Sequence, residues 1–231
     1  MSSDTISAGP FKRIGLMIPS VNTVMEPDFY RNVPAGWTVH TARMYLETTD
    51  AAGESRMLDE HTLPAARDLA TAHPDVGVFG CTSASALRGN AYEDEMIHRI
   101  SERTGAPTVS TMRSVREVLR SRGMTRLAVV TPYVDDLNGP MRISLEADGF
   151  EVLRIRGLQI RDGFELARVP RERIVAFIRE TLEGLSPNGL FISCTNFPVM
   201  ALLSELRTMF AFPVACSNEA VLEKAVAAAR G

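Results

Sequence analysis

The sequence predicts an α/β protein made of two similar halves, each built on a parallel sheet. Apolar runs rich in β-branched residues alternate along the chain with segments whose apolar residues recur at helical spacing. Alternation of this kind indicates βαβ units, in which the strands are parallel. Short motifs also recur at one constant offset along the 231 residues, and this indicates an internal duplication.

Eight segments have the length and composition of buried strands. They are residues 13–18, 37–44, 75–80, 106–110, 126–131, 150–158, 189–193 and 212–216. Four of the intervening segments have the periodicity of amphipathic helices, and several of them are closed by a glycine. These helices are expected at residues 91–105, 114–123, 169–184 and 218–230.

Three pairs of equivalent positions are separated by the same 113 residues. The pairs are Pro19 with Pro132, Gly36 with Gly149, and Cys81 with Cys194. A charged connection, SRGMTR, lies between the two copies near the middle of the chain. We therefore expect an N-terminal α/β domain over residues 1–122, whose last helix is able to cross to the other half, and a C-terminal α/β domain over residues 123–231.

Composition and charge favour a small-molecule partner. Hydrophobic residues make up 45% of the chain, and the net charge of −3 comes from interspersed acids and bases, without the basic footprint that nucleic acid or an anionic membrane requires. No apolar stretch reaches the length of a membrane span, and MSSDTISAGPFK lacks the pattern of a secretory signal. We expect a cytoplasmic protein without nucleic-acid or membrane partners, whose three cysteines stay thiols.

Cys81 in FGCTSAS and Cys194 in ISCTNFP each end a strand. Ligands of open α/β sheets bind beyond the carboxyl ends of the strands, so a two-fold arrangement of the halves places the two thiols on opposite walls of one interdomain cleft. Backbone N–H groups and a following helix are expected to lower the pKa of the thiols there. The thiolates would then serve as a nucleophile or a base near neutral pH. Buried cysteines also serve as plain core packing, and Cys216 is interpreted as structural or cavity lining.

Neutral polar residues follow other strands at the same edge of the sheets. Asn22 comes after the first strand and Tyr133 after the fifth, where ordinary turn chemistry is the alternative explanation. The residues beside the two cysteines are Thr82, Ser83, Thr195 and Asn196. Together these side chains offer hydrogen bonds to a carboxylate without an arginine.

Other sequence features carry little chemistry. The four histidines have no metal-ligand spacing, and no glycine-rich phosphate motif follows a strand, so neither a metal nor a nucleotide cofactor is expected. The acids of YEDE, residues 92–95, are interpreted as the solvated face of a helix.

Four motifs, in their combination and order, carry a resemblance that covers nearly the whole chain. They are PSVNTVMEPDF, FGCTSAS, VTPYVDDLN and ISCTNFP. The sequence resembles the aspartate/glutamate racemase superfamily, and within it the group of maleate cis-trans isomerases, arylmalonate decarboxylases and ectoine-utilisation proteins. The resemblance implies two pseudo-symmetric flavodoxin-like domains around an interdomain active-site cleft, and a cofactor-independent enzyme acting on a small carboxylate or dicarboxylate.

The resemblance also implies roles for individual residues. It implies that Cys81 and Cys194 are the catalytic pair. It implies substrate contacts from Asn22, Thr82, Ser83, Tyr133, Thr195 and Asn196. One departure concerns the substrate, because this chain has Asp162-Gly163 where maleate isomerases have Asp-Asn, and one expected amide contact is therefore missing. Both cysteine motifs are closer to those of the ectoine-utilisation group.

Two thiols facing one substrate support two reactions through an enediolate-type intermediate. A base and an acid on opposite sides of a planar intermediate racemise a carbon, whereas a nucleophile and an acid isomerise a double bond through its transient saturation. We predict a maleate cis-trans isomerase-like enzyme in which Cys81 is the nucleophile and Cys194 its acid/base partner. The alternatives are an arylmalonate decarboxylase-like lyase, an amino-acid racemase and a non-catalytic metabolite-binding protein. The sequence leaves a homo-oligomer open.

Overall fold

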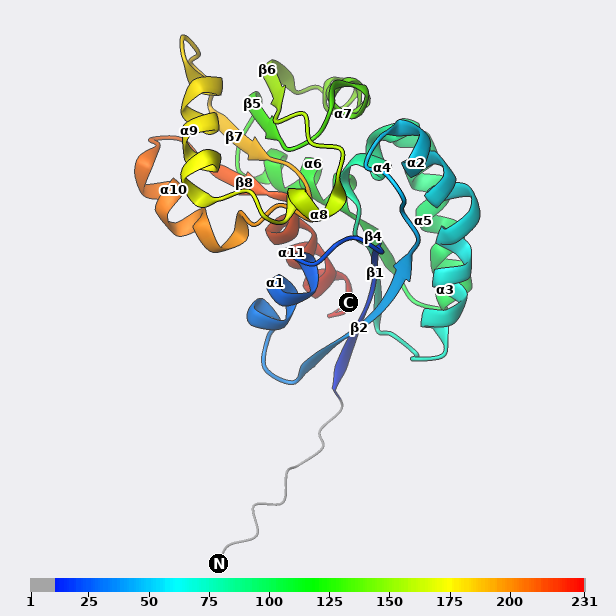
Figure 1. Cartoon of the computed structure of the whole chain (residues 1–231). Helices are drawn as coiled ribbons and strands as arrows, with labels where there is room; N and C mark the ends of the chain where they lie inside the picture. Colours follow the sequence, from blue (N-terminus) through cyan, green and yellow to red (C-terminus); the bar gives the residue numbers. More distant parts are fainter. Residues whose placement is uncertain (1–10, 231) are drawn as a thin grey trace, which may run out of the picture.

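Two four-stranded parallel sheets form the framework of the protein, one in each half of the chain (Figure 1). The computed structural model describes residues 11–230. The first sheet has the strand order β2-β1-β3-β4, and the second has the corresponding order β6-β5-β7-β8. The predicted α/β class with two pseudo-symmetric, flavodoxin-like halves is confirmed. The stretch MSSDTISAGP, to which most of the expectation about a secretory signal applies, lies outside the described residues.

All eight predicted strands are present. They are β1 (Lys12–Pro19), β2 (Trp37–Met44), β3 (Val76–Phe79), β4 (Thr108–Ser110), β5 (Arg126–Thr131), β6 (Glu151–Gly157), β7 (Gly189–Ile192) and β8 (Val214–Cys216). In each sheet the first strand lies inside and pairs in parallel with the second and third. Residues that point to both faces of β1 and β5 are buried, as expected for parallel sheets covered by helices on both sides.

Helices connect the strands and cover the sheets. They are α1 (Met25–Asn32), α2 (Ala51–Arg56), the π-helical segment η1 (Met57–His61), α3 (Thr62–Ala70), α4 (Thr82–Leu87), α5 (Asn90–Thr104), α6 (Thr111–Ser121), α7 (Asp135–Ala147), α8 (Gly163–Leu166), α9 (Arg171–Leu182), the 3₁₀ segment η2 (Met200–Leu202), α10 (Leu203–Met209) and α11 (Ser217–Ala228). The four predicted helices correspond to α5, α6, α9 and α11. Among residues 11–230, no helix is both long and apolar enough to cross a membrane.

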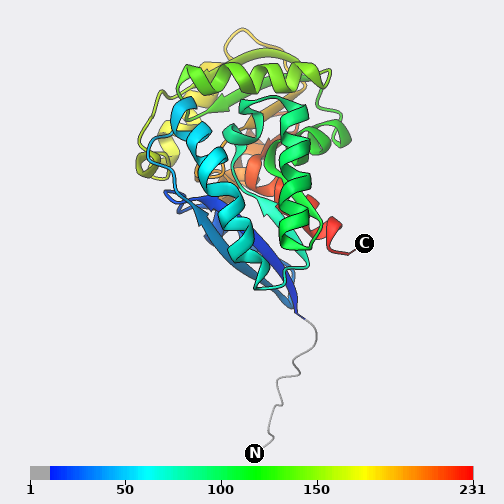
Figure 2. The same cartoon turned by 90° about the vertical axis from the view of Figure 1, so that its right-hand side faces the viewer.

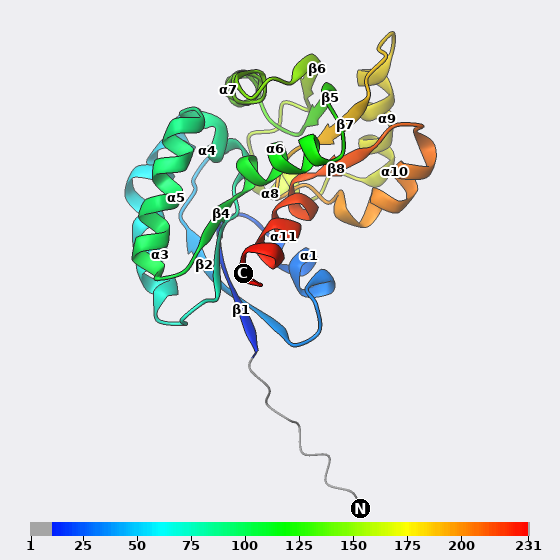
Figure 3. The same cartoon turned by 180° about the vertical axis from the view of Figure 1, so that it is seen from behind.

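The last helix of each half packs on the sheet of the other half. The α6 side chains in the core of the second sheet are Met112, Val115, Val118 and Leu119. The α11 side chains in a core cluster of the first sheet are Val221, Leu222 and Ala225. Figure 3 shows α6 against the second sheet and α11 beside α1 and β1. The domain bounds 1–122 and 123–231 stay a prediction, because each half completes the core of the other.

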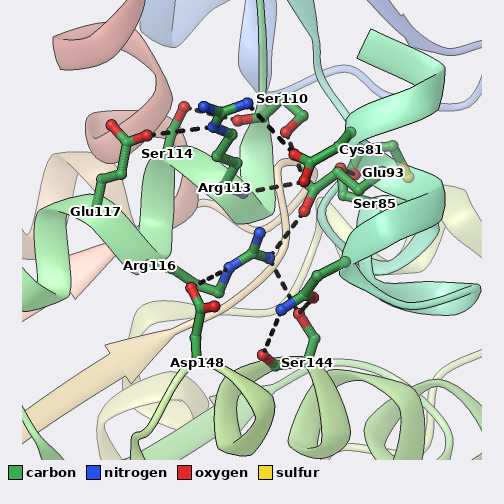
Figure 4. A network of polar contacts seen from close by, with 12 residues as sticks. Cys81, Ser85, Glu93, Ser110, Arg113, Ser114, Arg116, Glu117, Ser144 and Asp148 are labelled. Atoms are coloured by element: carbon green, nitrogen blue, oxygen red, sulfur yellow. Dashed lines mark hydrogen bonds and ion pairs between the residues drawn. The ribbon is translucent and has the colours of Figure 1, made fainter. Parts of the chain in front are cut away.

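A buried ion pair lies where the two halves join (Figure 4). Arg116 on α6 and Glu93 on α5 are 5% and 0% exposed, and their Nη1 and Oε2 atoms are 2.8 Å apart. Burial raises the pKa of Glu93, and the Arg116 guanidinium offsets part of that rise. The expectation that YEDE is a solvated face is therefore wrong for Glu93, although Asp94 and Glu95 are exposed. Glu93 is buried because its carboxyl group meets Ser110 at the end of β4 and the first turns of α6.

The same arginine extends the network into the second half. Its Nε donates to Asp148 Oδ2 at 2.8 Å and its Nη1 donates to Ser144 Oγ at 3.1 Å. Ser144 lies on α7, the helix that Figure 2 shows across the top of the first-half helices, and it donates to Asn90 Oδ1 at 2.7 Å. One guanidinium therefore holds α5, α6 and α7 together.

We predict that Arg116→Met destabilises the protein by about 3–5 kcal/mol, because it leaves the Glu93 carboxylate buried without its partner. The matched control is Arg113→Met on the same helix, where the side chain is 53% exposed. Exposed ion pairs contribute about 0–1 kcal/mol, so this control should change stability little. Urea unfolding followed by circular dichroism measures both, and equal losses would contradict the role assigned to the pair.

Candidate active site

A small pocket lies between the two halves, beyond the carboxyl ends of β1, β3, β5 and β7. All eight predicted site residues line it: Asn22, Cys81, Thr82, Ser83, Tyr133, Cys194, Thr195 and Asn196. The predicted convergence of the strand ends on one interdomain cleft is therefore what the structure shows. Cys216, by contrast, is 3% exposed at the end of β8 and packs in the core of the second sheet, away from this pocket.

The two cysteines occupy equivalent places but have different backbones. Cys81 is the extended residue before α4, with φ −138°. Cys194 has φ +100°, a region that residues with a side chain rarely adopt and that costs of the order of 1–3 kcal/mol. Its backbone N–H donates to Ser217 Oγ at 3.1 Å, and its sulfur accepts from the N–H of Asn196 at 3.3 Å. These contacts hold the strained residue in place.

The expectation of acidic thiols is wrong for this closed pocket. Burial raises the pKa of Cys194 to about 12, and backbone and side-chain hydrogen bonds from Asn196 and Tyr133 offset only part of the rise. Burial raises the pKa of Cys81 well above its ordinary value, and the neighbouring Glu54 raises it further. The backbone N–H groups foreseen from the sequence are present, but desolvation of the thiolates outweighs them.

The side chains of the two predicted amide residues, Asn22 and Asn196, form hydrogen bonds within the protein. Asn22 donates to Thr195 Oγ1 at 3.0 Å and accepts from the N–H groups of Val24 and Met25. Asn196 accepts from the N–H of Thr23 at 2.9 Å. These bonds run between the β1 loop and the β7 loop and so fasten the two walls of the pocket together. Direct contact of either amide with a ligand stays a prediction.

The hydroxyls beside the cysteines also connect the walls. Thr195 Oγ1 donates to the carbonyl of Gly80 at 3.0 Å, and Thr82 Oγ1 donates to Ser217 Oγ at 2.9 Å. Tyr133 is 1% exposed, its hydroxyl accepts from Ser193 Oγ at 3.4 Å, and burial raises its pKa well above the ordinary value. Tyr133 therefore stays protonated and remains a hydrogen-bond donor at neutral pH.

Comparison with known proteins identifies the family of this chain. The family model for arylmalonate decarboxylase matches residues 14–230. The chain belongs to the arylmalonate decarboxylase family. A maleate isomerase of Nocardia farcinica is 28% identical over 213 residues, which are 88% of this chain and 84% of that protein. An arylmalonate decarboxylase of Bordetella bronchiseptica is 28% identical over 151 residues, which are 65% of this chain and 63% of that protein.

A solved structure agrees with these relationships. It is a variant of the Nocardia farcinica maleate cis-trans isomerase with a covalently bound succinylcysteine intermediate, and its TM-score is 0.87 at 26% identity over 94% of this chain and 92% of that chain. The resemblance to the maleate isomerase and arylmalonate decarboxylase group is thereby confirmed.

Several lining residues of this family member were not among the predicted ones. Glu54 on α2 is fully buried and lines the pocket together with Leu46, Thr49 and Leu166. Glu54 lies in AAGESR, six residues of ordinary helical composition, so nothing local to the sequence marks it. Ser217 is outside the lining but supports it, because it accepts hydrogen bonds from Thr82 Oγ1 and the Cys194 N–H; its place just past β8 is the signal that could have pointed to it.

Gly163 takes the place where an amide side chain is expected in maleate isomerases. A Cβ added there would lie 2.5 Å from Val21 Cγ2 and 3.3 Å from Thr49 Oγ1. The Gly163 carbonyl accepts from Asn196 Nδ2 at 2.7 Å, so the backbone is held close to the pocket wall. The packing around Gly163 therefore leaves no room for the amide side chain that is missing from this sequence.

The pocket is nearly closed. Its free volume is about 20 Å³, enough for about one water molecule. A four-carbon dicarboxylate needs several times that volume, so the walls must separate before a substrate enters. Leu166 on α8, which Figure 1 shows between the two halves, forms part of the closed wall.

We predict that Gly163→Asn destabilises the protein by about 1–3 kcal/mol, the usual cost of overpacking. The additional change Val21→Ala should recover part of the loss by removing the methyl group nearest to the new side chain. Gly139→Asn is the control, since a Cβ at Gly139 on α7 would meet no described atom within 4 Å apart from its chain neighbours and the nearby backbone of its own helix. Thermal unfolding of the four proteins measures the effect, and full stability in Gly163→Asn would refute the close approach.

Proposed function

We propose that this family member is a cofactor-independent isomerase of a small carboxylate that works in the manner of maleate cis-trans isomerase, with Cys81 and Cys194 as its catalytic pair. The observation that carries the proposal is that each half supplies one cysteine to the same buried pocket. The Nocardia farcinica enzyme with its succinylcysteine intermediate supports thiol addition as the chemistry. A family likeness alone would leave the reaction open, because folds host several activities.

The proposed reaction begins with addition of the Cys81 thiolate to one carbon of the substrate double bond. The sulfur–carbon bond forms while the π electrons move toward the neighbouring carboxylate, which gives an enediolate-type intermediate. Cys194 gives its proton to the other carbon, and rotation about the new single bond becomes free. Return of that proton to Cys194 and loss of the Cys81 thiolate restore the double bond as the trans isomer.

The raised thiol pKa of Cys194 suits the role of the acid. With a pKa of about 12 it holds its proton at neutral pH and so has one to give to a carbanion. The buried Tyr133 hydroxyl, also protonated, donates a hydrogen bond to the developing oxyanion in the proposal. Removal of one preorganised donor of this kind typically costs about 2.7–4 kcal/mol of barrier. The remaining proposed substrate contacts are Asn22, Thr82, Ser83, Thr195 and Asn196.

A decarboxylating lyase is the second candidate, and the match of the arylmalonate decarboxylase family model favours it. Loss of CO₂ by itself creates the carbanion, so a single acid is sufficient for that reaction. A first thiol at Cys81 has no part in it. Amino-acid racemisation uses both thiols and differs from isomerisation in its substrate.

We propose further that the partner of the protein is a small carboxylate and that neither nucleic acid nor a membrane is a partner. The proposed location is the cytoplasm. Within residues 11–230 no three His, Cys, Asp or Glu side chains group closely enough to hold a metal ion, and independence from cofactors stays a prediction. The proposal is compatible with a homo-oligomer.

We predict that Cys81→Ser and Cys194→Ser each reduce turnover by several orders of magnitude, because the thiol is lost while the side-chain volume hardly changes. Circular dichroism and unfolding should report an intact fold in both variants. Cys216→Ser is the control, since this thiol lies outside the pocket, and it should retain turnover. Activity close to wild type in either pocket variant would remove the two-thiol mechanism.

We predict that the protein interconverts isomers or exchanges an α-hydrogen of a small carboxylate without releasing CO₂ from arylmalonates. Proton NMR in D₂O with maleate, aspartate, glutamate and phenylmalonate in separate tubes distinguishes the reactions. Fumarate from maleate supports the isomerase, and exchange in an amino acid alone supports a racemase. Rapid formation of phenylacetate, with no change in the other tubes, would favour the lyase. A protein inactive with all four compounds but protected from thiol alkylation by one of them would be a binding protein.

A further inference from the structure

Glu54 is a buried carboxyl group in the pocket that the proposed reaction does not yet use. It lies on α2, is 0% exposed and lines the pocket beside both cysteines. Its Oε1 accepts a short hydrogen bond from Ser83 Oγ, and its Oε2 has no hydrogen-bond partner among residues 11–230. The described residues that line the pocket include no arginine or lysine. A fully buried carboxyl group with one unpartnered oxygen is costly for the fold, so a functional reason is called for.

Ser83 connects this carboxyl group to the first thiol. Its Oγ is 3.9 Å from Cys81 Sγ, within hydrogen-bond range for sulfur, and it donates in the other direction to Glu54 Oε1. All three side chains are buried. The atoms Sγ, Oγ and Oε1 therefore form a continuous route along which a proton can move without reaching solvent.

We propose that Glu54 accepts the proton of Cys81 through Ser83, and so generates the thiolate that adds to the substrate. This rests on the proposed function for the role of Cys81 as nucleophile. Glu54 acts on the Cys81 sulfur only through Ser83, so its role is to determine where the Cys81 proton lies. The small free volume around Cys81, about 20 Å³, favours a proton acceptor built into the pocket wall over bulk water.

The proton transfer balances without any further reagent. The S–H bond of Cys81 breaks as its proton passes to Ser83 Oγ, while the original Ser83 proton passes to Glu54. The result is a thiolate, an unchanged serine and a neutral carboxylic acid. When the thiolate leaves the substrate at the end of the cycle, the same two transfers in reverse restore the starting state.

The charges around Glu54 suit a base that works near neutral pH. Burial raises the pKa of Glu54 to about 8, the hydrogen bond from Ser83 opposes the rise, and the carboxylates of Asp136 and Asp50 add to it. Asp136 lies at the exposed start of α7, and Asp50 caps α2 and pairs with Arg161. The other titratable groups in the lining are the two cysteines and Tyr133, which are neutral at pH 7 because burial raises the pKa of each.

The sign of the pH dependence follows from the direction of proton transfer. Only the ionised form of Glu54 accepts a proton, and this form increases as the pH rises through about 8. Formation of the Cys81 thiolate through the relay should therefore increase up to about pH 8 and then level off. Without the relay, thiolate formation depends on hydroxide alone and rises about tenfold per pH unit without a plateau, as for any thiol far below its pKa.

The test measures alkylation of Cys81 by iodoacetamide between pH 6 and 9.5 in a Cys194→Ser/Cys216→Ser background. Glu54→Gln keeps the acceptor oxygen for Ser83 but cannot take up a proton, and Ser83→Ala interrupts the route. We expect each change to lower the rate at pH 7 by about 10²–10⁴-fold, the usual range for general base catalysis, and to abolish the plateau. The double variant should be no slower than either single variant. Glu47→Gln, at a side chain 60% exposed, is the control and should leave the profile unchanged.

A second variant keeps the proposal testable if Glu54→Gln folds poorly. Asp136→Asn removes a charge that raises the pKa of Glu54, so the plateau should begin at a lower pH. A profile that does not move, or that moves to higher pH, would overturn the relay. So would a Glu54→Gln profile identical to that of the Glu47→Gln control.

Turnover of maleate by the protein with its native cysteines separates this inference from the proposed function. A Glu54-dependent alkylation profile without any isomerisation would support the relay and refute the isomerase. Isomerisation with an alkylation profile indifferent to Glu54 would refute the relay and leave the isomerase standing.

Discussion

The buried guanidinium of Arg116, which pairs with Glu93 and also bonds to Ser144 and Asp148 of the second half, is the constraint on which the arrangement of the two halves depends. A lone carboxylate at the position of Glu93 would be very costly, and a lone guanidinium equally so, so the two must be buried together. Arg116 reaches Glu93 only if α6 lies against α5, and it reaches Ser144 only if α7 lies against both. The contacts of Arg116 therefore link α5 and α6 of the first half to α7 of the second half.

The arrangement of the two halves also determines the chemistry of the pocket. The walls come from both halves and are fastened by bonds such as Asn22 to Thr195, so the pocket keeps a small free volume as long as the halves stay in register. Burial strengthens hydrogen bonds to a developing oxyanion, but it equally penalises a resting thiolate. The raised pKa of both thiols is the cost of this burial. In our proposal it also accounts for the buried carboxyl group of Glu54 beside the two cysteines.

The fold was predictable because its signals are local and repeated. Strand composition, helical periodicity and the 113-residue offset each depend on the identity of residues along the chain, and they suffice for two parallel sheets with Cys81 and Cys194 at matching strand ends. The burial of Glu93 and the position of Glu54 were not predictable in this way. Both carboxyl groups lie on helices of ordinary composition, and only tertiary contacts take them out of water: those of Glu93 with Ser110 and α6, and the packing of α2 on α4 around Glu54. The raised pKa values of Cys81 and Cys194 also come from burial in the folded protein and were not predictable for the same reason.

The exchange of α6 and α11 between the sheets has a consequence for the origin of the protein. A chain of half the length would leave the face of its sheet uncovered, and two identical copies could cover each other only by trading their last helices. Such an ancestral pair would have had two-fold symmetry, with the same thiol environment on both sides of its pocket. A single chain carrying both copies is free of that restriction. In the sequence, the residue 113 positions after Glu54 is Ala167, so the carboxyl group beside Cys81 has no counterpart at the constant offset.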